Sequence, residues 1–169
     1  MDGYLYVFHT EGNGEPQMIF PDSSLNSGRN SISSHVPYEV PSSLDPNPDL
    51  RWFTFYSTPA IEHVYIVVTR QPLQNVPIAE KLVGYCKTAP KDCPWKPSGA
   101  LWAQLKSKSQ AKLSTSKSRS QGEAQSSIEQ ESVGRALGMT KDAPPPSVIN
   151  MSASSETETL ITLINLIHK

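Results

Sequence analysis

Histidine is the residue type in this chain with the widest range of chemistry, and four are present: His9, His35, His63 and His168. His9 and His63 lie in stretches with strand-like composition, so they could sit on neighbouring strands of one sheet face. Such a pair could bind a metal ion, or act as a base if a carboxylate stood beside one of them in a cleft. Histidines at the surface or at hairpin ends explain the pattern better, and we predict no metal site.

The two cysteines, Cys86 and Cys93, have six residues between them. In an oxidising compartment they can form a disulfide that closes a short loop, whereas in the cytosol they would be two thiols. The sequence leaves both alternatives open. Zinc binding is disfavoured because the spacing is wider than that of a zinc knuckle and no histidine or second cysteine pair lies nearby.

One stretch resembles the start of a calcium-binding loop, because Asp45, Asn47 and Asp49 alternate. The match fails at two positions that the loop requires. Leu50 stands where the turn glycine should be, and Tyr56 replaces the bidentate glutamate. The prolines between the polar residues predict a rigid polar turn instead.

No catalytic constellation is present in the sequence. The pattern Ser114-x-x-Lys117 matches that of a serine nucleophile, but it lies in a Ser/Lys-biased segment where such matches arise by chance. Neither a Gly-x-Ser-x-Gly elbow nor a glycine-rich phosphate loop occurs. We therefore predict no catalytic residue, no cofactor-binding residue and no cofactor, and we expect the protein not to be an enzyme.

Length and charge limit the class of protein. A chain of 169 residues with a formal net charge of −1 is expected to form a single domain over residues 1–169. Its charge gives no general attraction to nucleic acid, and the basic run 106–119 lacks interleaved aromatic residues that stack on bases. No run of 18 apolar residues occurs. We predict neither a nucleic-acid partner nor a transmembrane segment.

The N-terminal half has the composition of antiparallel strands. Residues 4–10 and 18–20 are predicted to pair as a hairpin, with Asn13-Gly14 supplying the positive φ angles of a tight turn. Residues 51–57 and 62–70 are predicted to form a second hairpin. The sequence also begins abruptly at its first strand, so we expect a strand, linker or export signal to precede it; a cytosolic protein that starts with a strand is the alternative.

Residues 36–41 alternate apolar and polar types between prolines, which predicts a short edge strand. Apolar spacing further along predicts short helices over 77–83 and 100–113, with a third over 128–137. Residues 106–125 carry many serines and lysines and bury little apolar surface. We expect this segment to be mobile and to lie at the surface.

Residues 159–168 have apolar spacing that suits a helix but an Ile/Thr content that suits a strand. We favour a strand that returns to the sheet of the N-terminal half. The sequence therefore predicts a mainly β fold, with α+β as the alternative. We expect an antiparallel sandwich-like or barrel-like sheet with one to three short inserted helices and a flexible Ser/Lys-rich loop.

Aromatic residues alternate along the predicted strands, so one set must face the core while another can form an exposed patch. The patch would serve a peptide, a glycan or a partner domain, and its candidate residues are Tyr4, Tyr6, Trp52, Tyr56 and Tyr65. Core packing alone is the alternative interpretation of the same residues.

The order of several short elements resembles the bacterial family called domain of unknown function 4384. The elements are Asp2-Gly-Tyr-Leu-Tyr-Val7, Ile19-Phe-Pro21, Asn30-Ser-Ile32, the Pro41 region, Phe53-Thr-Phe55, Ile66 to Leu73, Pro145 to Ile149 and Ile164 to His168. The resemblance implies a β-rich accessory domain of bacterial envelope, multidomain signalling or peptidase-like proteins. It also implies one further strand ahead of Asp2, and it supplies no catalytic residues because the family has no established activity.

These observations lead to two hypotheses about function. The first is a non-enzymatic accessory or interaction domain of a bacterial envelope or multidomain signalling protein, which predicts exposed apolar surface or a free strand edge. Its partner would be another protein, another domain of the parent chain, or a second copy that pairs through a sheet edge. The alternative is a domain that binds a small molecule or glycan on an aromatic sheet face. The resemblance favours a location outside the cytoplasm.

Overall fold

The computed structural model describes residues 2–36, 38–42, 47, 60–108 and 158–168. The chain divides into two compact units. The first comprises Met1–Ser34, Phe55–Leu113 and Ala153–Lys169, and the second comprises His35–Thr54 and Ser114–Ser152. All helices and strands described below belong to the first unit, and a single domain over 1–169 stays a prediction.

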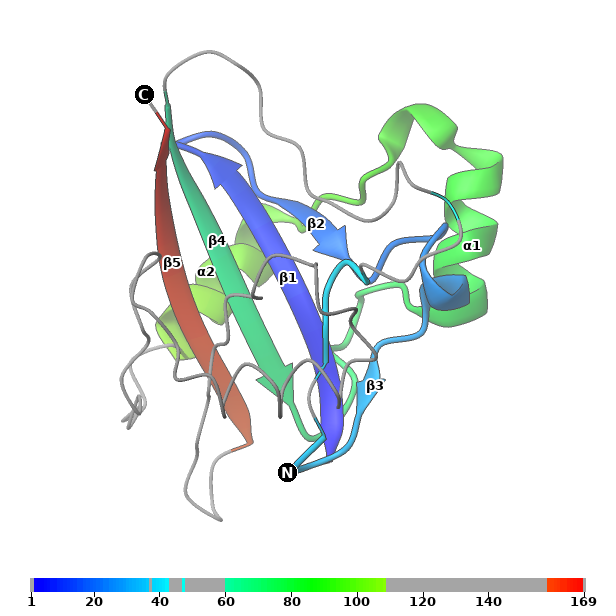
Figure 1. Ribbon diagram of the computed structural model, residues 1–169. Coiled ribbons are helices and arrows are strands. Elements are labelled where there is room, and N and C mark those ends of the chain that lie inside the picture. The colour runs from blue at the N-terminus through cyan, green and yellow to red at the C-terminus, as the bar shows by residue number, and fades with distance from the viewer. Residues whose placement is uncertain (1, 37, 43–46, 48–59, 109–157, 169) are drawn as a thin grey trace. The chain divides into compact units, whose positions relative to one another are not determined.

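The first unit is built on one antiparallel sheet. Its strands are β1 (Gly3–Glu11), β2 (Gln17–Phe20), β3 (Ser31–Ile32), β4 (Ala60–Thr69) and β5 (Thr159–His168). They are ordered β2-β1-β4-β5, with β3 paired to the start of β1 (Figure 1). The sheet is open. The mainly β, α+β fold predicted from the sequence is confirmed, and the sheet formed by the described residues does not close into a barrel.

The predicted N-terminal hairpin is present as β1 and β2, but its turn differs from the prediction. The positive φ angle belongs to Gly12, at +51°, and not to Asn13-Gly14. The Gly14 N–H donates to the Glu11 carbonyl at 2.8 Å, which closes a tight turn inside a longer loop. Glycine is favoured at position 12 because a left-handed backbone strains any residue with a Cβ.

The segment whose sequence suits helix and strand equally is a strand. β5 pairs with β4 along its whole length, from Ala60 opposite His168 to Thr69 opposite Thr159. Its β-branched residues favour a strand, and side chains of both parities are buried at its start, where Leu160 and Ile161 are each 5% exposed. The prediction of a strand over 159–168 that returns to the sheet is confirmed.

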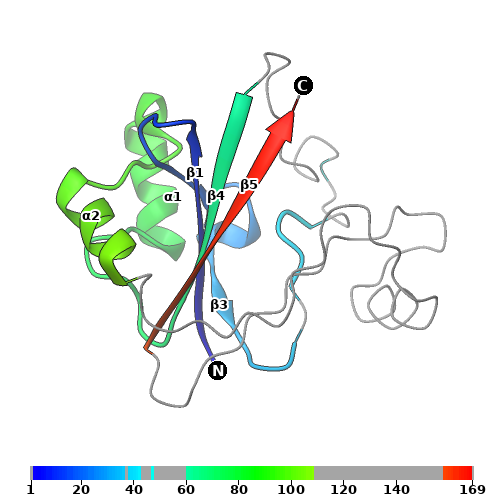
Figure 2. The same cartoon turned by 90° about the vertical axis from the view of Figure 1, so that its left-hand side faces the viewer.

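Two α-helices lie on the same side of the sheet (Figure 2). α1 (Ala79–Thr88) begins two residues later than predicted because Ile78 is still extended, and it ends before Pro90. Pro90 opens the 3-10 turn η3 (Pro90–Asp92); a second such turn, η1 (Asn26–Gly28), lies earlier in the chain. The predicted helix over 100–113 is present as α2 (Gly99–Lys108) within the described residues. It begins after Ser98, whose hydroxyl accepts a hydrogen bond from the Leu101 N–H.

The core lies between the sheet and these helices. Tyr6 and Phe8 of β1, Val67 of β4 and Ile161 of β5 are buried against apolar side chains of α1 and α2. Residues of one parity on a strand share a face, so this assignment fixes the direction of every other side chain on the same strands. The opposite face carries Leu5, Val7, Val68 and Leu160, which are also buried.

The two cysteines form a disulfide, which decides between the alternatives that the sequence left open. Cys86 of α1 is bonded to Cys93, the residue after η3. The segment that follows Cys93 lies along β2, because the Met18 N–H donates to the Trp95 carbonyl at 2.8 Å. An ion pair at 3.0 Å between the Lys96 Nζ and a Glu15 carboxylate oxygen joins the same two regions at the surface.

The predicted edge strand over 36–41 is wrong at its described residues, since 36 and 38–41 adopt no strand. The prolines at 37 and 41 remove two of the N–H donors that a ladder of this length would need. Residues 51–57, 109–125 and 128–137 lie outside the described residues, so the predictions made for them stay predictions. Across the described part of the chain, the helices are too short and too polar to span a bilayer.

Candidate functional site

The outer edge of β5 is the most unusual feature of the first unit. Antiparallel residues alternate between pairs that exchange N–H···O bonds and pairs that do not. The Arg70 N–H donates to the Glu158 carbonyl at 3.0 Å, in phase with the β4–β5 register. Peptide groups of Glu158 and every second residue after it therefore point at β4. Those that point away from β4 belong to Thr159, Ile161, Leu163, Asn165 and Ile167.

Among the described residues no strand pairs with this outer edge of β5. Long edge strands are normally shielded by charge, proline or a bulge, because their unpaired peptide groups template pairing with another chain. None of these devices occurs between Thr159 and Ile167, where the sequence is Thr-Leu-Ile-Thr-Leu-Ile-Asn-Leu-Ile and the ladder to β4 is regular. Within the part of the chain that the structure describes, this edge therefore carries none of the features that block strand addition.

An exposed row of apolar side chains, here called the apolar strip, runs beside this edge on the helix-covered face. It consists of Ile61 and Tyr65 on β4 and Leu163 and Ile167 on β5, which are cross-strand partners in two pairs. Exposed fractions are 49% for Ile61, 47% for Leu163 and 69% for Ile167. Large apolar side chains scattered singly are normal at a surface, whereas here two cross-strand pairs lie along the same face of neighbouring strands.

The apolar strip is exposed because α2 is too short to cover the strands. A helix of 10 residues is about 15 Å long, whereas a strand of 10 residues spans about 33 Å. α2 packs near Ile161, where Leu105 is buried in the core cluster. The other half of β4 and β5, towards Ile61 and Ile167, has no helix above it among the described residues.

One polar pair interrupts the apolar strip. The Nδ1 of His63 lies 2.7 Å from the Oδ1 of Asn165, directly across the β4–β5 ladder. An amide oxygen only accepts, so His63 donates from Nδ1. His63 is thus partnered by an amide and not by a carboxylate. The arrangement orients Asn165 at the edge, with its amide nitrogen available to a neighbouring strand.

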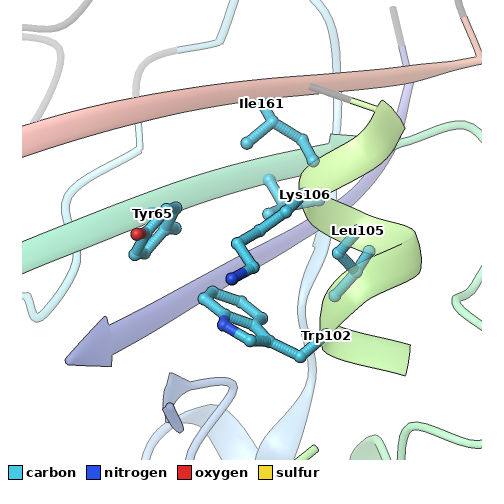
Figure 3. Close-up of a pocket in the computed structure, with 6 residues that line it drawn as sticks. Tyr65, Trp102, Leu105, Lys106 and Ile161 are labelled. Atoms are coloured by element: carbon cyan, nitrogen blue, oxygen red, sulfur yellow. The ribbon is translucent and has the colours of Figure 1, made fainter. Parts of the chain in front are cut away.

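Between α2 and the sheet lies a small hollow, lined by Tyr65, Val67, Trp102, Leu105, Lys106 and Ile161 (Figure 3). Tyr65 and Trp102 meet edge to face with ring centroids 4.8 Å apart, and the Lys106 Nζ lies 5.7 Å from the Trp102 ring centre. The hollow is small, with a volume of about 10 Å³. That is room for about one water, far below the few hundred Å³ of a ligand site.

A second polar cluster joins three strands on the opposite face of the sheet. The His9 Nε2 lies 2.6 Å from a Glu62 carboxylate oxygen, and the Gln17 side-chain nitrogen lies 3.3 Å from the His9 Nδ1. Both partners are largely buried, with side-chain exposures of 14% for His9 and 4% for Glu62. An imidazole that donates from Nε2 to Glu62 and accepts at Nδ1 from Gln17 satisfies this geometry. With both ring nitrogens engaged, the cluster ties β2, β1 and β4 together.

The aromatic residues proposed as a surface fall into three groups. Tyr6 is fully buried and its hydroxyl accepts a hydrogen bond from the Leu73 N–H at 2.9 Å, so it belongs to the core and offers no surface. Tyr4 packs against the same core, and Tyr65 is half-buried in the apolar strip. Trp52 and Tyr56 lie outside the described residues. One of the five, Tyr65, therefore lies at the candidate site.

Sequence reasoning missed the most exposed parts of the site. Ile61, Leu163 and Ile167 are apolar residues in strands, and such residues are expected in a core. A signal was nevertheless present, because the last strand has apolar residues in both parities and no charge, unlike the edge strands of most sheets. Glu62 was also missed as a partner for His9, since their pairing depends on register.

The described residues contain no group of three or more side chains placed to hold a metal ion. Neither His9 nor His63 has a second histidine as partner, and the two lie on opposite faces of the sheet, as their different partners require. Comparison of the chain with family models, with curated proteins and with solved structures finds no match.

Proposed function

We propose that this protein is a non-enzymatic interaction module, and that it takes an extended segment of a protein partner as an additional strand along β5. One observation carries the proposal: the residues whose peptide groups point outwards from β5 also direct their side chains to the face of the apolar strip. A strand added there would gain backbone hydrogen bonds and apolar contacts at once. Strand addition of this kind draws affinity from the main chain and specificity from alternate side chains.

The same observations weigh against the alternative of a small-molecule or glycan site. The hollow between α2 and the sheet admits about one water, and Tyr65 and Trp102 already pack edge to face against each other there. A sugar ring would need an open aromatic face. The apolar strip follows two strands from Tyr65 and Leu163 to Ile61 and Ile167, which suits an extended polypeptide better than a compact ligand.

The proposal that the protein is not an enzyme rests on the His9 cluster. His9 stands beside a carboxylate, which is one requirement of a base, but its second nitrogen faces Gln17 and both His9 and Glu62 are largely buried. A general base must reach the proton that it removes. The contacts of His9 with Glu62 and Gln17 suit a structural role, because they link β1 to β4 and β2.

The proposed setting is an accessory domain of a bacterial envelope or multidomain signalling protein outside the cytoplasm. The Cys86–Cys93 disulfide supports this setting, because such bonds persist in oxidising compartments. The resemblance to domain of unknown function 4384 supports the same setting and remains a proposal.

The test is selection of peptides from a random library displayed on phage, with the purified full chain as bait. We expect enrichment of segments that alternate apolar residues and avoid central prolines. Binding of a selected peptide should fall at least tenfold when its N–H groups that face β5 are N-methylated, and should change little when the intervening N–H groups are.

Ile167→Lys is the matched variant in the chain, and Gln74→Lys is its control in an exposed loop. The proposal predicts loss of peptide binding in the first and retention in the second. Failure to enrich any peptide, or equal tolerance of both N-methylation patterns, would overturn strand addition at β5.

A further inference from the structure

We infer that a second copy of this chain occupies the outer edge of β5, with the two β5 strands antiparallel around a two-fold axis at Asn165. This inference rests on the proposed function, because it names the partner that pairs with the same edge. The observations that carry it are the phase of the peptide groups, the positions of the exposed side chains and the absence of charge on the strand.

Symmetry restricts how two β5 strands can pair. A two-fold axis perpendicular to the sheet makes the two β5 strands antiparallel. It also leaves the helix-covered faces of both copies on the same side of the joined sheet. Directly opposite residues must then share a face, so the axis passes through a residue and its copy. Hydrogen bonding is best when the paired residues are those with outward peptide groups, which on β5 are the odd-numbered ones from Thr159 to Ile167.

Among these registers, the axis at Asn165 matches side chains best. It places Leu163 opposite Ile167 of the second copy, and Ile167 opposite Leu163 of that copy, so that the exposed apolar residues of β5 cover each other. It also sets Asn165 against its own copy, where one amide can donate to the other. Each of these pairs exchanges two backbone hydrogen bonds.

The neighbouring registers are poorer. An axis at Leu163 would place Ile161 opposite Asn165, and an axis at Ile164 would place Leu163 opposite Asn165. Both leave an apolar side chain against a polar one. The first also sets Ile167 against Thr159, and the second sets it against Ile161, which is already buried in its own copy. An axis at Asn165 also keeps the two α2 helices apart, because α2 packs at Ile161, towards the other end of β5 (Figure 1).

Charge favours a second copy over a dedicated partner. No charged residue occurs from Thr159 to Ile167, so pairing of the strand with itself places no like charges opposite each other. A surface that selects a different protein usually carries charges that reject the wrong one. The β5 edge has none, whereas its apolar residues complement themselves under two-fold symmetry.

Sedimentation of the full chain between about 1 and 200 µM tests the association, since a single seam of this kind implies micromolar affinity. We expect a monomer–dimer equilibrium whose dissociation constant rises at least tenfold in Ile167→Lys and is unchanged in Gln74→Lys. Ile167 is 69% exposed, so the lysine variant should keep the fold, which circular dichroism checks.

Cysteine cross-linking tests the register without relying on a destabilised variant. Asn165→Cys should form a disulfide-linked dimer in mild oxidant, whereas Leu163→Cys and Ile167→Cys should each cross-link poorly alone and efficiently when mixed. Peptide mapping must show Cys86–Cys93 intact. A dimer that cross-links in another pattern would overturn the inference.

The outcomes separate this inference from the proposal on which it rests. A chain that stays monomeric at all concentrations but binds selected peptides along β5 would overturn self-pairing and leave strand addition standing. A monomer that binds no peptide would overturn both. A dimer that forms equally well in Ile167→Lys would show that the copies meet elsewhere, and would overturn self-pairing as well.

Discussion

Tyr6 lies on strand β1, packs into the core and is hydrogen-bonded to the loop that follows β4. Its ring is buried beside Phe8, while its hydroxyl accepts the Leu73 N–H from the chain that leaves β4. Burial raises the pKa of the Tyr6 phenol above the ordinary value of 10.0, and the hydrogen bond from Leu73 opposes this only in part. The sequence left Tyr6 either in an exposed patch or in the core; it lies in the core, where it fixes the path of the chain towards α1.

The raised pKa predicts a loss of stability in alkali. Because the folded protein holds the Tyr6 proton more tightly than the unfolded chain, the stabilisation is complete below the unfolded pKa and is lost as pH rises through the folded one. Urea unfolding should show a free energy that begins to fall at about pH 10, where an unfolded tyrosine ionises, and that keeps falling until the raised pKa of the folded protein is passed. Absorbance of the Tyr6 phenolate should rise only at a pH above the ordinary tyrosine pKa in the native protein.

Tyr6→Phe and Tyr85→Phe make the matched pair for this test. The first should lose the late phenolate signal and cost about 1–3 kcal/mol at neutral pH, since the Leu73 N–H is left without an acceptor. The second, on α1, should keep both the signal and the pH dependence. A late signal that survives in Tyr6→Phe would contradict the assignment.

At the scale of elements, β5 is a strand with two different halves on its helix-covered face. Ile161 is buried beneath α2, and Ile167 is the most exposed large apolar residue among those described. The two side chains are chemically identical and lie on one strand and one face. Their exposed fractions differ because Ile161 lies beneath α2 and Ile167 lies beyond the end of that helix.

This difference predicts opposite responses to the same substitution. Ile161→Ala should lower the free energy of unfolding by about 2–5 kcal/mol, because it leaves a cavity beside Leu105. Ile167→Ala should change it by less than about 0.5 kcal/mol in dilute, monomeric protein. Urea denaturation of both variants measures the difference. Equal losses would mean that the sheet near Ile167 is covered in solution.

The disulfide is a second feature of element scale, since it joins α1 to the segment that lies along β2. In the chain-entropy model, closing a loop of this length lowers the entropy of the unfolded chain and so stabilises the folded protein by about 2.5 kcal/mol. Replacing both Cys86 and Cys93 with serine should therefore reduce stability by roughly that amount. Hydrogen exchange at the Met18 amide should also accelerate, because its acceptor Trp95 lies close behind the bond.

Thermal and urea unfolding measure the first effect, and reduction of the natural chain provides a control that adds no new side chain. A double serine variant with unchanged stability and unchanged Met18 exchange would contradict a structural role for the bond.

Sequence alone predicted elements where local composition decides them. The β1–β2 hairpin, the two helices and the strand character of 159–168 follow from apolar spacing and residue type. The turn at Gly12 could not be predicted in this way, because Asn13-Gly14 is the stronger local turn signal, whereas the chain forms a longer loop with its positive φ angle at Gly12. The register that joins His9 to Glu62, and the position of β5 at an edge, depend on which strands pair over long distances, and no local pattern encodes that.

At the scale of the whole molecule, the first unit has a protected side and an open one. The short strand β2 is flanked by the disulfide-bonded segment, whose Trp95 carbonyl takes up an N–H from the sheet. β5 has no such neighbour among the described residues. This asymmetry is why the candidate site could be placed only after the strand order was known, and why only Tyr65 of it was named from the sequence.

The pairing of β4 with β5 has a consequence for synthesis. Roughly ninety residues separate Thr69 from Thr159, so a ribosome that adds about 5–20 residues per second needs several seconds to travel from one strand to the other. During that interval β4 has its first neighbour, β1, but not its second. Until β5 has been synthesised, the side of β4 that will pair with it has no partner strand. A chaperone that binds extended apolar segments would be expected to bind along this side of β4.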